Sequence, residues 1–174
     1  MPQTQPQTRT LVLIRHAKSS WDDPNMRDFD RPINERGQHD APDMGARLAA
    51  RGQRPDRFYC SSARRARETA LILAQAVGYP EADLEAESGL YMADNAQLLE
   101  RIRRFPDSAG EVWLVGHNPD ITELVNQLAG FQTHDLPTCA VVRMAFDVGH
   151  WKDIEPGEAR VLEVHRPKHP WETT

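Results

Sequence analysis

Short apolar runs alternate with amphipathic segments along this chain, and that alternation constrains its fold more than any other feature. The run at 10–14 is continuously apolar, as in a strand buried on both faces of a sheet, and 56–62 and 111–117 also have strand character. Two later segments, 138–146 and 159–166, are expected as strands nearer a sheet edge. Strands that alternate with helices predict an α/β fold, a three-layer α/β/α sandwich with a mostly parallel central sheet.

Four amphipathic segments predict the helices, at 34–51, about 63–77, 95–105 and 118–130. Asn34 is a suitable N-cap for the first of them, because its side-chain oxygen can accept a bond from a free backbone N–H. Pro119 suits the first turn of the last helix. Gly52, Gly78 and Gly130 follow three of these segments and are expected to end the helices.

The length of 174 residues predicts one domain at 9–167. The Pro-, Gln- and Thr-rich tail at 1–8 is expected to be disordered, and 168–174 is expected to be a C-terminal tail. A net charge of −5 argues against a nucleic-acid or membrane surface as the main partner. The acidic, compact chain also fits a monomer.

The two cysteines and the lack of targeting segments bear on location. Cys60 and Cys139 show neither metal-ligand spacing nor a disulfide framework, so they are expected to be small buried residues. No apolar run approaches the roughly 20 residues of a membrane helix, and the N-terminus has no apolar leader core. A cytoplasmic location is therefore expected.

Basic side chains follow three of the predicted strands. Arg15 and His16 end the first strand, Ser61 and the basic stretch 64–67 follow the second, and His117 follows the third. Ligands of open α/β sheets bind beyond the carboxyl ends of the strands. The charge of the basic stretch, taken alone, favours a solvated helix face over an anion site. Together, the three strand ends predict one basic site.

Two arginines and two histidines at one rim suit phosphoryl transfer. Arginine presents forked donors that match phosphate oxygens, and positive charge can stabilise the transition state. A histidine can also act as a nucleophile and carry the phosphoryl group until water removes it. Because no metal-binding pattern accompanies these residues, neither a metal nor another cofactor is expected.

Three motifs resemble those of the histidine phosphatase superfamily, the branch with a phosphoglycerate mutase-like fold. LIRHAKS resembles its R-H-[GA] motif, SSARRARETA its S-x-x-x-R-A-x-x-T-A segment, and VGHNP its second-histidine motif. The order and spacing hold from about Leu11 to about His165. The short chain, with RHAKSSWDD and DFDRPINERG, is most similar to SixA-type phosphohistidine phosphatases.

The resemblance implies a role for each matching residue. His16 resembles the nucleophile, and Arg15 a donor of the phosphate pocket. Arg65, the arginine before alanine in R-A-x-x-T, resembles the second pocket arginine. His117 resembles the histidine that binds phosphoryl oxygens, and the helix that starts after it would add a favourable dipole.

Three further residues are candidates at this site. Many relatives carry a carboxylate general acid after the second helix, and Glu87 is the best-placed candidate for that role here. A surface acid is the alternative interpretation of Glu87. Lys18 and Ser19 follow the nucleophile and are candidates for phosphate contact.

The expected function is a metal-independent phosphatase that dephosphorylates phosphohistidine on a partner protein. A phosphohistidine leaves as imidazole, whereas an alkyl phosphate benefits from a proton donor. The alternatives are a small-molecule phosphomonoesterase or mutase of the same superfamily and a phosphohistidine-binding module without turnover. The presence of His16 argues against the binding module.

Overall fold

The computed structural model describes residues 7–130 and 133–167. Its strands are β1 (Arg9–Arg15), β2 (Arg57–Ser61), β3 (Glu85–Glu87), β4 (Glu111–Gly116), β5 (Val141–Phe146) and β6 (Arg160–His165). Its α-helices are α1 (Glu35–Ala50), α2 (Arg64–Val77), α3 (Asn95–Arg103) and α4 (Asp120–Ala129). Residues 1–6 of the predicted N-terminal tail and the whole predicted C-terminal tail lie outside the described residues.

One six-stranded sheet has the order β3-β2-β4-β1-β5-β6. The pairings from β3 to β1 are parallel, and β5 and β6 join antiparallel. The expected α/β fold with a mostly parallel sheet is confirmed. The two late strands lie at one edge as expected, with β6 outermost and β5 next to it. One detail differs: β3 was not predicted, because the sequence of Glu85–Glu87 is short and mostly polar.

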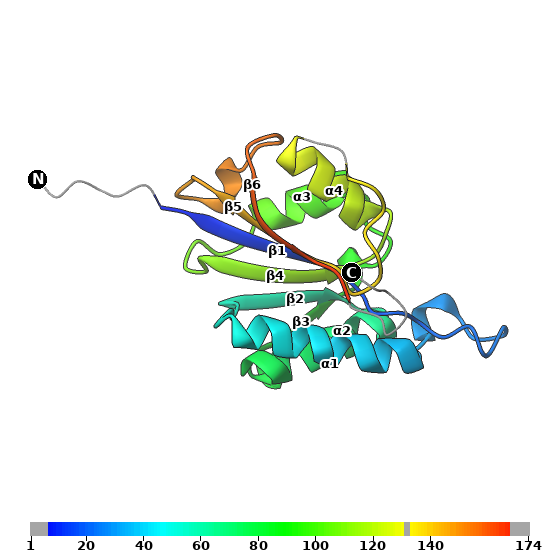
Figure 1. Cartoon of the computed structure of the whole chain (residues 1–174). Coiled ribbons are helices and arrows are strands. Elements are labelled where there is room, and N and C mark those ends of the chain that lie inside the picture. Colours follow the sequence, from blue (N-terminus) through cyan, green and yellow to red (C-terminus); the bar gives the residue numbers. More distant parts are fainter. Residues whose placement is uncertain (1–6, 131–132, 168–174) are drawn as a thin grey trace, which may run out of the picture.

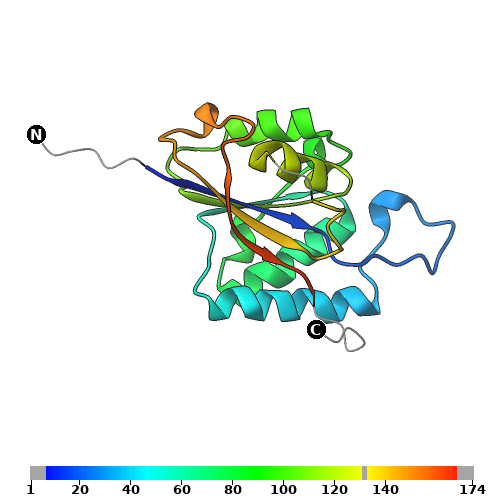
Figure 2. The ribbon, with the colours of Figure 1, turned by 45° about the horizontal axis from the view of Figure 1, so that its top comes forward.

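The helices cover both faces of the sheet. Figures 1 and 2 show α1 and α2 on one face and α3 and α4 on the other. Val12 and Ile14 of β1 are buried in the cluster under α1 and α2, while Leu11 and Leu13 are buried in the cluster on the other face. Because both faces are covered, every residue in this part of β1 has to be apolar, which explains the continuous run.

The helix ends mostly follow the expected capping. The Asn34 side chain accepts a hydrogen bond of 2.9 Å from the backbone N–H of Gly37. Gly78 and Gly130 end α2 and α4 with positive φ angles of 77° and 72°. The prediction for Pro119 was one position wrong, since this residue is the N-cap of α4 and the helix begins at Asp120.

The carboxyl ends of β1, β2 and β4 lie side by side. Arg15 pairs with Gly116 in the sheet register, and Cys60 pairs with Val115. The residues that directly follow these three strands therefore lie next to one another at the same edge of the sheet. A long segment between β1 and α1, blue in Figures 1 and 2, projects beyond the same end of the sheet.

Both cysteines are free and buried, as expected, and burial raises the pKa of each thiol to about 12. Among the described residues, no helix is both long enough and apolar enough to cross a membrane.

Candidate active site

His16 follows β1 and presents one ring nitrogen for chemistry. Its side chain is almost fully buried, and Nδ1 lies 2.8 Å from the carbonyl oxygen of Ala17. A carbonyl only accepts, so Nδ1 carries the proton and Nε2 keeps its lone pair. The pKa of His16 is lowered to about 3, mainly by burial. The hydrogen bond to Ala17 raises this pKa, whereas His117, Arg65 and Arg15 lower it further. The ring is therefore neutral at physiological pH, with a lone pair on Nε2.

Arg65 lies against His16 from the first turn of α2. Its Nε–H points at Nε2 of His16 across 3.4 Å, and its side chain is 7% exposed. The other two guanidinium nitrogens donate to Asp28, Nη1 to the backbone oxygen at 2.7 Å and Nη2 to Oδ2 at 3.0 Å. Thr69, one turn along α2, accepts from the backbone N–H of Ala17 at 2.9 Å. The start of α2 is thus tied to the segment that follows His16.

His117 lies beside His16 at the end of β4. The ring centroids are 5.1 Å apart, and Nε2 of His117 lies 2.8 Å from Oγ of Ser61. Burial lowers the pKa of His117 to about 4, with Arg65 contributing through its positive charge. Two neutral imidazoles and the guanidinium of Arg65 therefore meet where the three strands end.

Arg15 reaches the connection before β5. Its Nη1 donates to the carbonyl oxygen of Leu136 at 2.7 Å, and Nδ2 of Asn118 donates to the same oxygen at 3.0 Å. The Nε of Arg15 is buried without a hydrogen-bond partner among the described residues. This arginine therefore retains a donor for an incoming anion.

The structure places Glu87 in an ion pair. At the end of β3 its carboxylate accepts two bonds of 2.8 Å from Nε and Nη2 of Arg101. It lines a separate hollow together with Arg101 and with Gly89 and Leu90 of η3 (Ser88–Leu90). The hollow that contains Arg65 and His117 is lined by other residues. The predicted role of Glu87 as general acid lacks geometric support, because Arg101 binds its carboxylate away from His16. The sequence could not reveal this partner, which lies on α3.

Ser19 and Lys18 contribute mainly through the architecture of the segment after β1. The hydroxyl of Ser19 is buried and accepts from Nη1 of Arg31 at 3.0 Å. The backbone oxygen of Lys18 accepts from the N–H of Asn34 at 2.8 Å. These contacts hold the segment against the start of α1 and do not place either side chain on His16.

Asp28 and Tyr91 were missed by the sequence analysis. Asp28 lies in η1 (Asp28–Asp30), and its carboxylate accepts from Tyr91 at 2.7 Å, from Arg31 at 2.8 Å and from Arg65 at 3.0 Å. Burial favours its neutral form, but these hydrogen bonds hold the pKa of Asp28 well below its usual range. Asp28 looked like an ordinary loop residue because its partners come from three different parts of the chain.

The mouth of the site is a hollow of about 270 Å³. It is lined by Asp28, Arg65, Tyr91, Met92, His117, Asn118, Pro119 and Asp120. The acid nearest to Arg65 in this lining is Asp28, whose low pKa keeps it ionised. The hollow therefore offers hydrogen-bond donors to an anion, while Asp28 is unsuited to donate a proton.

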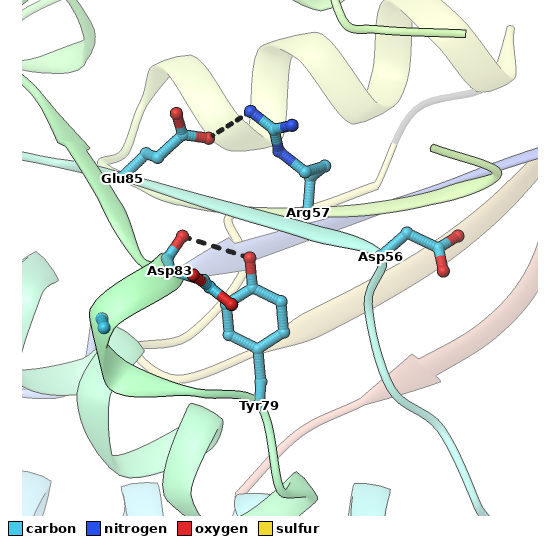
Figure 3. A pocket seen from close by; sticks show the side chains of 6 residues that line it. Asp56, Arg57, Tyr79, Asp83 and Glu85 are labelled. Carbon is cyan, nitrogen blue, oxygen red and sulfur yellow. Dashed lines mark hydrogen bonds and ion pairs between the residues drawn. The ribbon is translucent and has the colours of Figure 1, made fainter. Parts of the chain in front are cut away.

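A larger hollow, of about 440 Å³, lies at the amino end of β2 (Figure 3). There Arg57 pairs with Glu85 at 3.0 Å, and the Tyr79 hydroxyl donates to the backbone oxygen of Asp83 at 3.1 Å. Strand direction places this hollow away from His16, at the opposite end of β2. Its size therefore says nothing about the chemistry of the histidine site.

Comparisons with known proteins agree with this geometry. Residues 11–91 match the model of the histidine phosphatase superfamily (branch 1). An uncharacterised protein of Mycobacterium tuberculosis is 34% identical over 167 residues, which cover 89% of this chain and all of that one. The chain belongs to the histidine phosphatase superfamily. The matched region begins within β1 and extends beyond α2, so it includes His16 and Arg65.

Structural likeness places this histidine phosphatase with the SixA type. The crystal structure of a SixA protein from Agrobacterium tumefaciens has a TM-score of 0.77 and 26% identity, and the match covers 94% of this chain and all of that one. A 2,3-bisphosphoglycerate-dependent phosphoglycerate mutase of Mesorhizobium japonicum is 34% identical over 95 residues, 52% of this chain and 45% of that one. These findings support phosphatase activity and a phosphoglycerate mutase-like fold.

Proposed function

We propose that this phosphatase removes phosphoryl groups from phosphohistidine on a partner protein, through a phosphohistidine intermediate on Nε2 of His16. The observation that carries the proposal is the hydrogen bond between His16 Nδ1 and the carbonyl oxygen of Ala17. It leaves the Nε2 lone pair beside Arg65, which can neutralise a phosphoryl oxygen.

The reaction has two displacements at phosphorus. In the first, the Nε2 lone pair of His16 forms the new P–N bond while the P–N bond of the substrate breaks and its imidazole leaves. In the second, water attacks the phosphoryl group on His16, inorganic phosphate departs, and His16 regains its lone pair. Arg65, Arg15 and His117 would hold the phosphoryl oxygens, and the positive charge of the arginines suffices without a metal ion.

The acids near the site support phosphohistidine as the substrate class. Asp28 is held ionised by three donors, and Glu87 is bound by Arg101. Neither is placed to protonate an alkoxide, which is the poor leaving group of an alkyl ester. An imidazole leaves without that help, so a site in which arginines bind both Asp28 and Glu87 suits a phosphoramidate. Asp120, whose pKa is raised by burial and by the nearby Glu123 and Asp94, is the acid of the hollow that would serve an alkyl ester.

The likeness to a SixA protein supports the same substrate class, since that protein is named for phosphohistidine phosphatase activity. The mutase of Mesorhizobium japonicum supports the alternative, a small-molecule phosphomonoesterase, over about half of this chain. The engagement of Asp28 and Glu87 by arginines favours the phosphohistidine substrate over that alternative.

Substrate comparison tests the proposal. In EDTA, we expect kcat/KM to be much higher for a phosphohistidine protein and for p-nitrophenyl phosphate than for phosphoserine or 3-phosphoglycerate, because leaving-group quality sets the rate. Glu87→Gln should leave the phosphohistidine rate nearly unchanged. His16→Ala should abolish turnover with the fold intact, and mass spectrometry after an acid-free quench should find phosphate on His16.

Two results would contradict the proposal. Rapid cleavage of alkyl phosphates that is lost in Glu87→Gln would indicate a general phosphomonoesterase. Phosphate trapped on a residue other than His16 would exclude the intermediate.

A further inference from the structure

Ser61 contacts the second histidine of the site from a fully buried position at the end of β2. Its side-chain oxygen lies 2.8 Å from Nε2 of His117 and 3.2 Å from the backbone nitrogen of Ala63. These are the hydrogen-bond contacts of this hydroxyl within the described part of the chain. The contact with His117 matters because a neutral imidazole can be a donor or an acceptor at Nε2.

Counting protons decides the direction of that hydrogen bond. The backbone N–H of Ala63 can only donate, so Ser61 Oγ accepts from it. The hydroxyl proton of Ser61 then has Nε2 of His117 as its acceptor. If His117 instead donated from Nε2, a buried O–H would lack an acceptor. An unsatisfied buried donor is costly, because it has lost its hydrogen bond to water without gaining another.

The other nitrogen of His117 completes the argument. Nδ1 is buried and has no hydrogen-bond partner among the described residues. When Ser61 donates to Nε2, the neutral ring carries its proton on Nδ1, and only this one group lacks a partner. The opposite tautomer leaves two groups without partners, the Ser61 hydroxyl proton and the Nδ1 lone pair.

His16 and His117 then have the same tautomer and opposite roles. His16 is anchored through Nδ1 by the carbonyl of Ala17 and presents a lone pair. His117 is anchored through Nε2 by Ser61 and retains an N–H. A nucleophile needs a lone pair, whereas a phosphoryl oxygen needs a hydrogen-bond donor. The hydrogen bonds with Ala17 and Ser61 therefore suit one histidine to attack and the other to bind phosphate.

We propose that Ser61 is a positioning residue, which fixes the tautomer of His117 so that its Nδ1–H bonds an oxygen of the transferred phosphoryl group. The inference rests on the proposed phosphatase reaction but requires no particular leaving group. This role explains why a buried serine stands at the end of β2, and it differs from the role of the arginines, which bind phosphate directly.

The tautomer can be measured directly in the resting wild-type enzyme. Long-range ¹H–¹⁵N correlation spectra at pH 7 separate protonated from unprotonated ring nitrogens, and His117→Gln identifies the signals. We expect His117 to carry its proton on Nδ1, and saturating inorganic phosphate to shift the Nδ1–H signal. A proton on Nε2, or an Nδ1–H signal that phosphate bound at the site leaves unchanged, would overturn the inference.

Kinetics of Ser61→Ala provide the second test, with p-nitrophenyl phosphate as substrate. We expect kcat to fall roughly 10- to 100-fold, somewhat less than the 10²–10³ typical for outright loss of a donor, because a fraction of the rings still has the active tautomer. The ¹⁵N spectrum should show the proton shared between both nitrogens. Ser62→Ala is the matched control, since the neighbouring hydroxyl oxygen is buried and makes no hydrogen bond to His117 or to any other described residue.

The outcomes separate this inference from the proposed function. If Ser61→Ala keeps wild-type kcat, or keeps the proton on Nδ1 alone while kcat falls, Ser61 does not act through the tautomer. If the wild type has the expected tautomer and phosphate response but rejects phosphohistidine proteins, the substrate assignment fails while the role of Ser61 stands.

Discussion

At the scale of single residues, the adjacent arginines Arg64 and Arg65 lie in very different surroundings. Arg64 is about half exposed and pairs with Glu68 one turn away on α2, at 3.4 Å. Arg65 is buried and contacts both His16 and Asp28. Neighbouring helical residues point about 100° apart, so only one of the two can face the strand ends.

This difference predicts unequal effects of substitution. Arg65→Ala should lower kcat/KM roughly 10²- to 10³-fold, because a charge-assisted donor is lost from a shielded site. Arg64→Ala should stay close to wild type, since exposed ion pairs contribute little. The check is steady-state turnover of p-nitrophenyl phosphate by both variants, and a larger loss in Arg64→Ala would mean that the phosphate pocket is assigned to the wrong arginine.

At the scale of elements, the start of α1 packs against the backbone that follows His16. A Cβ on Gly37 would lie 2.5 Å from the carbonyl oxygen of Lys18 and 3.0 Å from Cβ of Ile33. The same carbonyl accepts the hydrogen bond from Asn34. The helix can therefore approach the segment after His16 only because residue 37 lacks a side chain.

Gly37→Ala should consequently disturb both stability and activity. Overpacking at such a contact costs about 1–3 kcal/mol in the free energy of unfolding, and displacement of the segment after His16 should lower kcat. Urea unfolding and turnover measure the two effects. Gly89→Ala is the control, because a Cβ there meets nothing within 4 Å. If Gly37→Ala has the same free energy of unfolding as the wild type, the segment after His16 can move to admit the methyl group without loss of stability.

At the scale of the whole molecule, the fold keeps two histidines neutral, and its stability should therefore depend on pH. Burial lowers the pKa of His16 to about 3 and that of His117 to about 4, from an unfolded value near 6.5. Between these values the unfolded chain binds more protons than the folded one. The stabilisation is thus fully present above pH 6.5 and is lost as the pH falls towards 3.

Lowering the pH from 7 to 5 should destabilise the protein through His16 by about 1–2 kcal/mol, given a maximum of about 1.4 kcal/mol per pH unit for one group. Urea unfolding of wild type and His16→Gln at both pH values measures this contribution. The variant should lose less stability on acidification than the wild type. Equal losses in the two proteins would show that His16 does not contribute to the pH dependence.

The sequence by itself determined the α/β class and the strand ends that deliver the basic residues. Continuous apolar runs such as the one in β1 are a local pattern, and a covered parallel sheet requires them. Helix ends were similarly accessible, because Asn34, Gly78 and Gly130 act through their own backbone and near neighbours. His16 and His117 could be proposed because each follows a predicted strand, and Arg65 because it matches the R-A-x-x-T segment of the family that the chain resembles.

Only the tertiary structure decided the partners of these residues. Glu87 was a plausible acid until α3 brought Arg101 against it, and Asp28 was an ordinary loop residue until Arg65 and Tyr91 met its carboxylate. Ser61 binds His117 although 56 positions separate them. Local patterns report burial and capping, whereas the charge state and proton position of a side chain depend on atoms that only folding brings within hydrogen-bond distance.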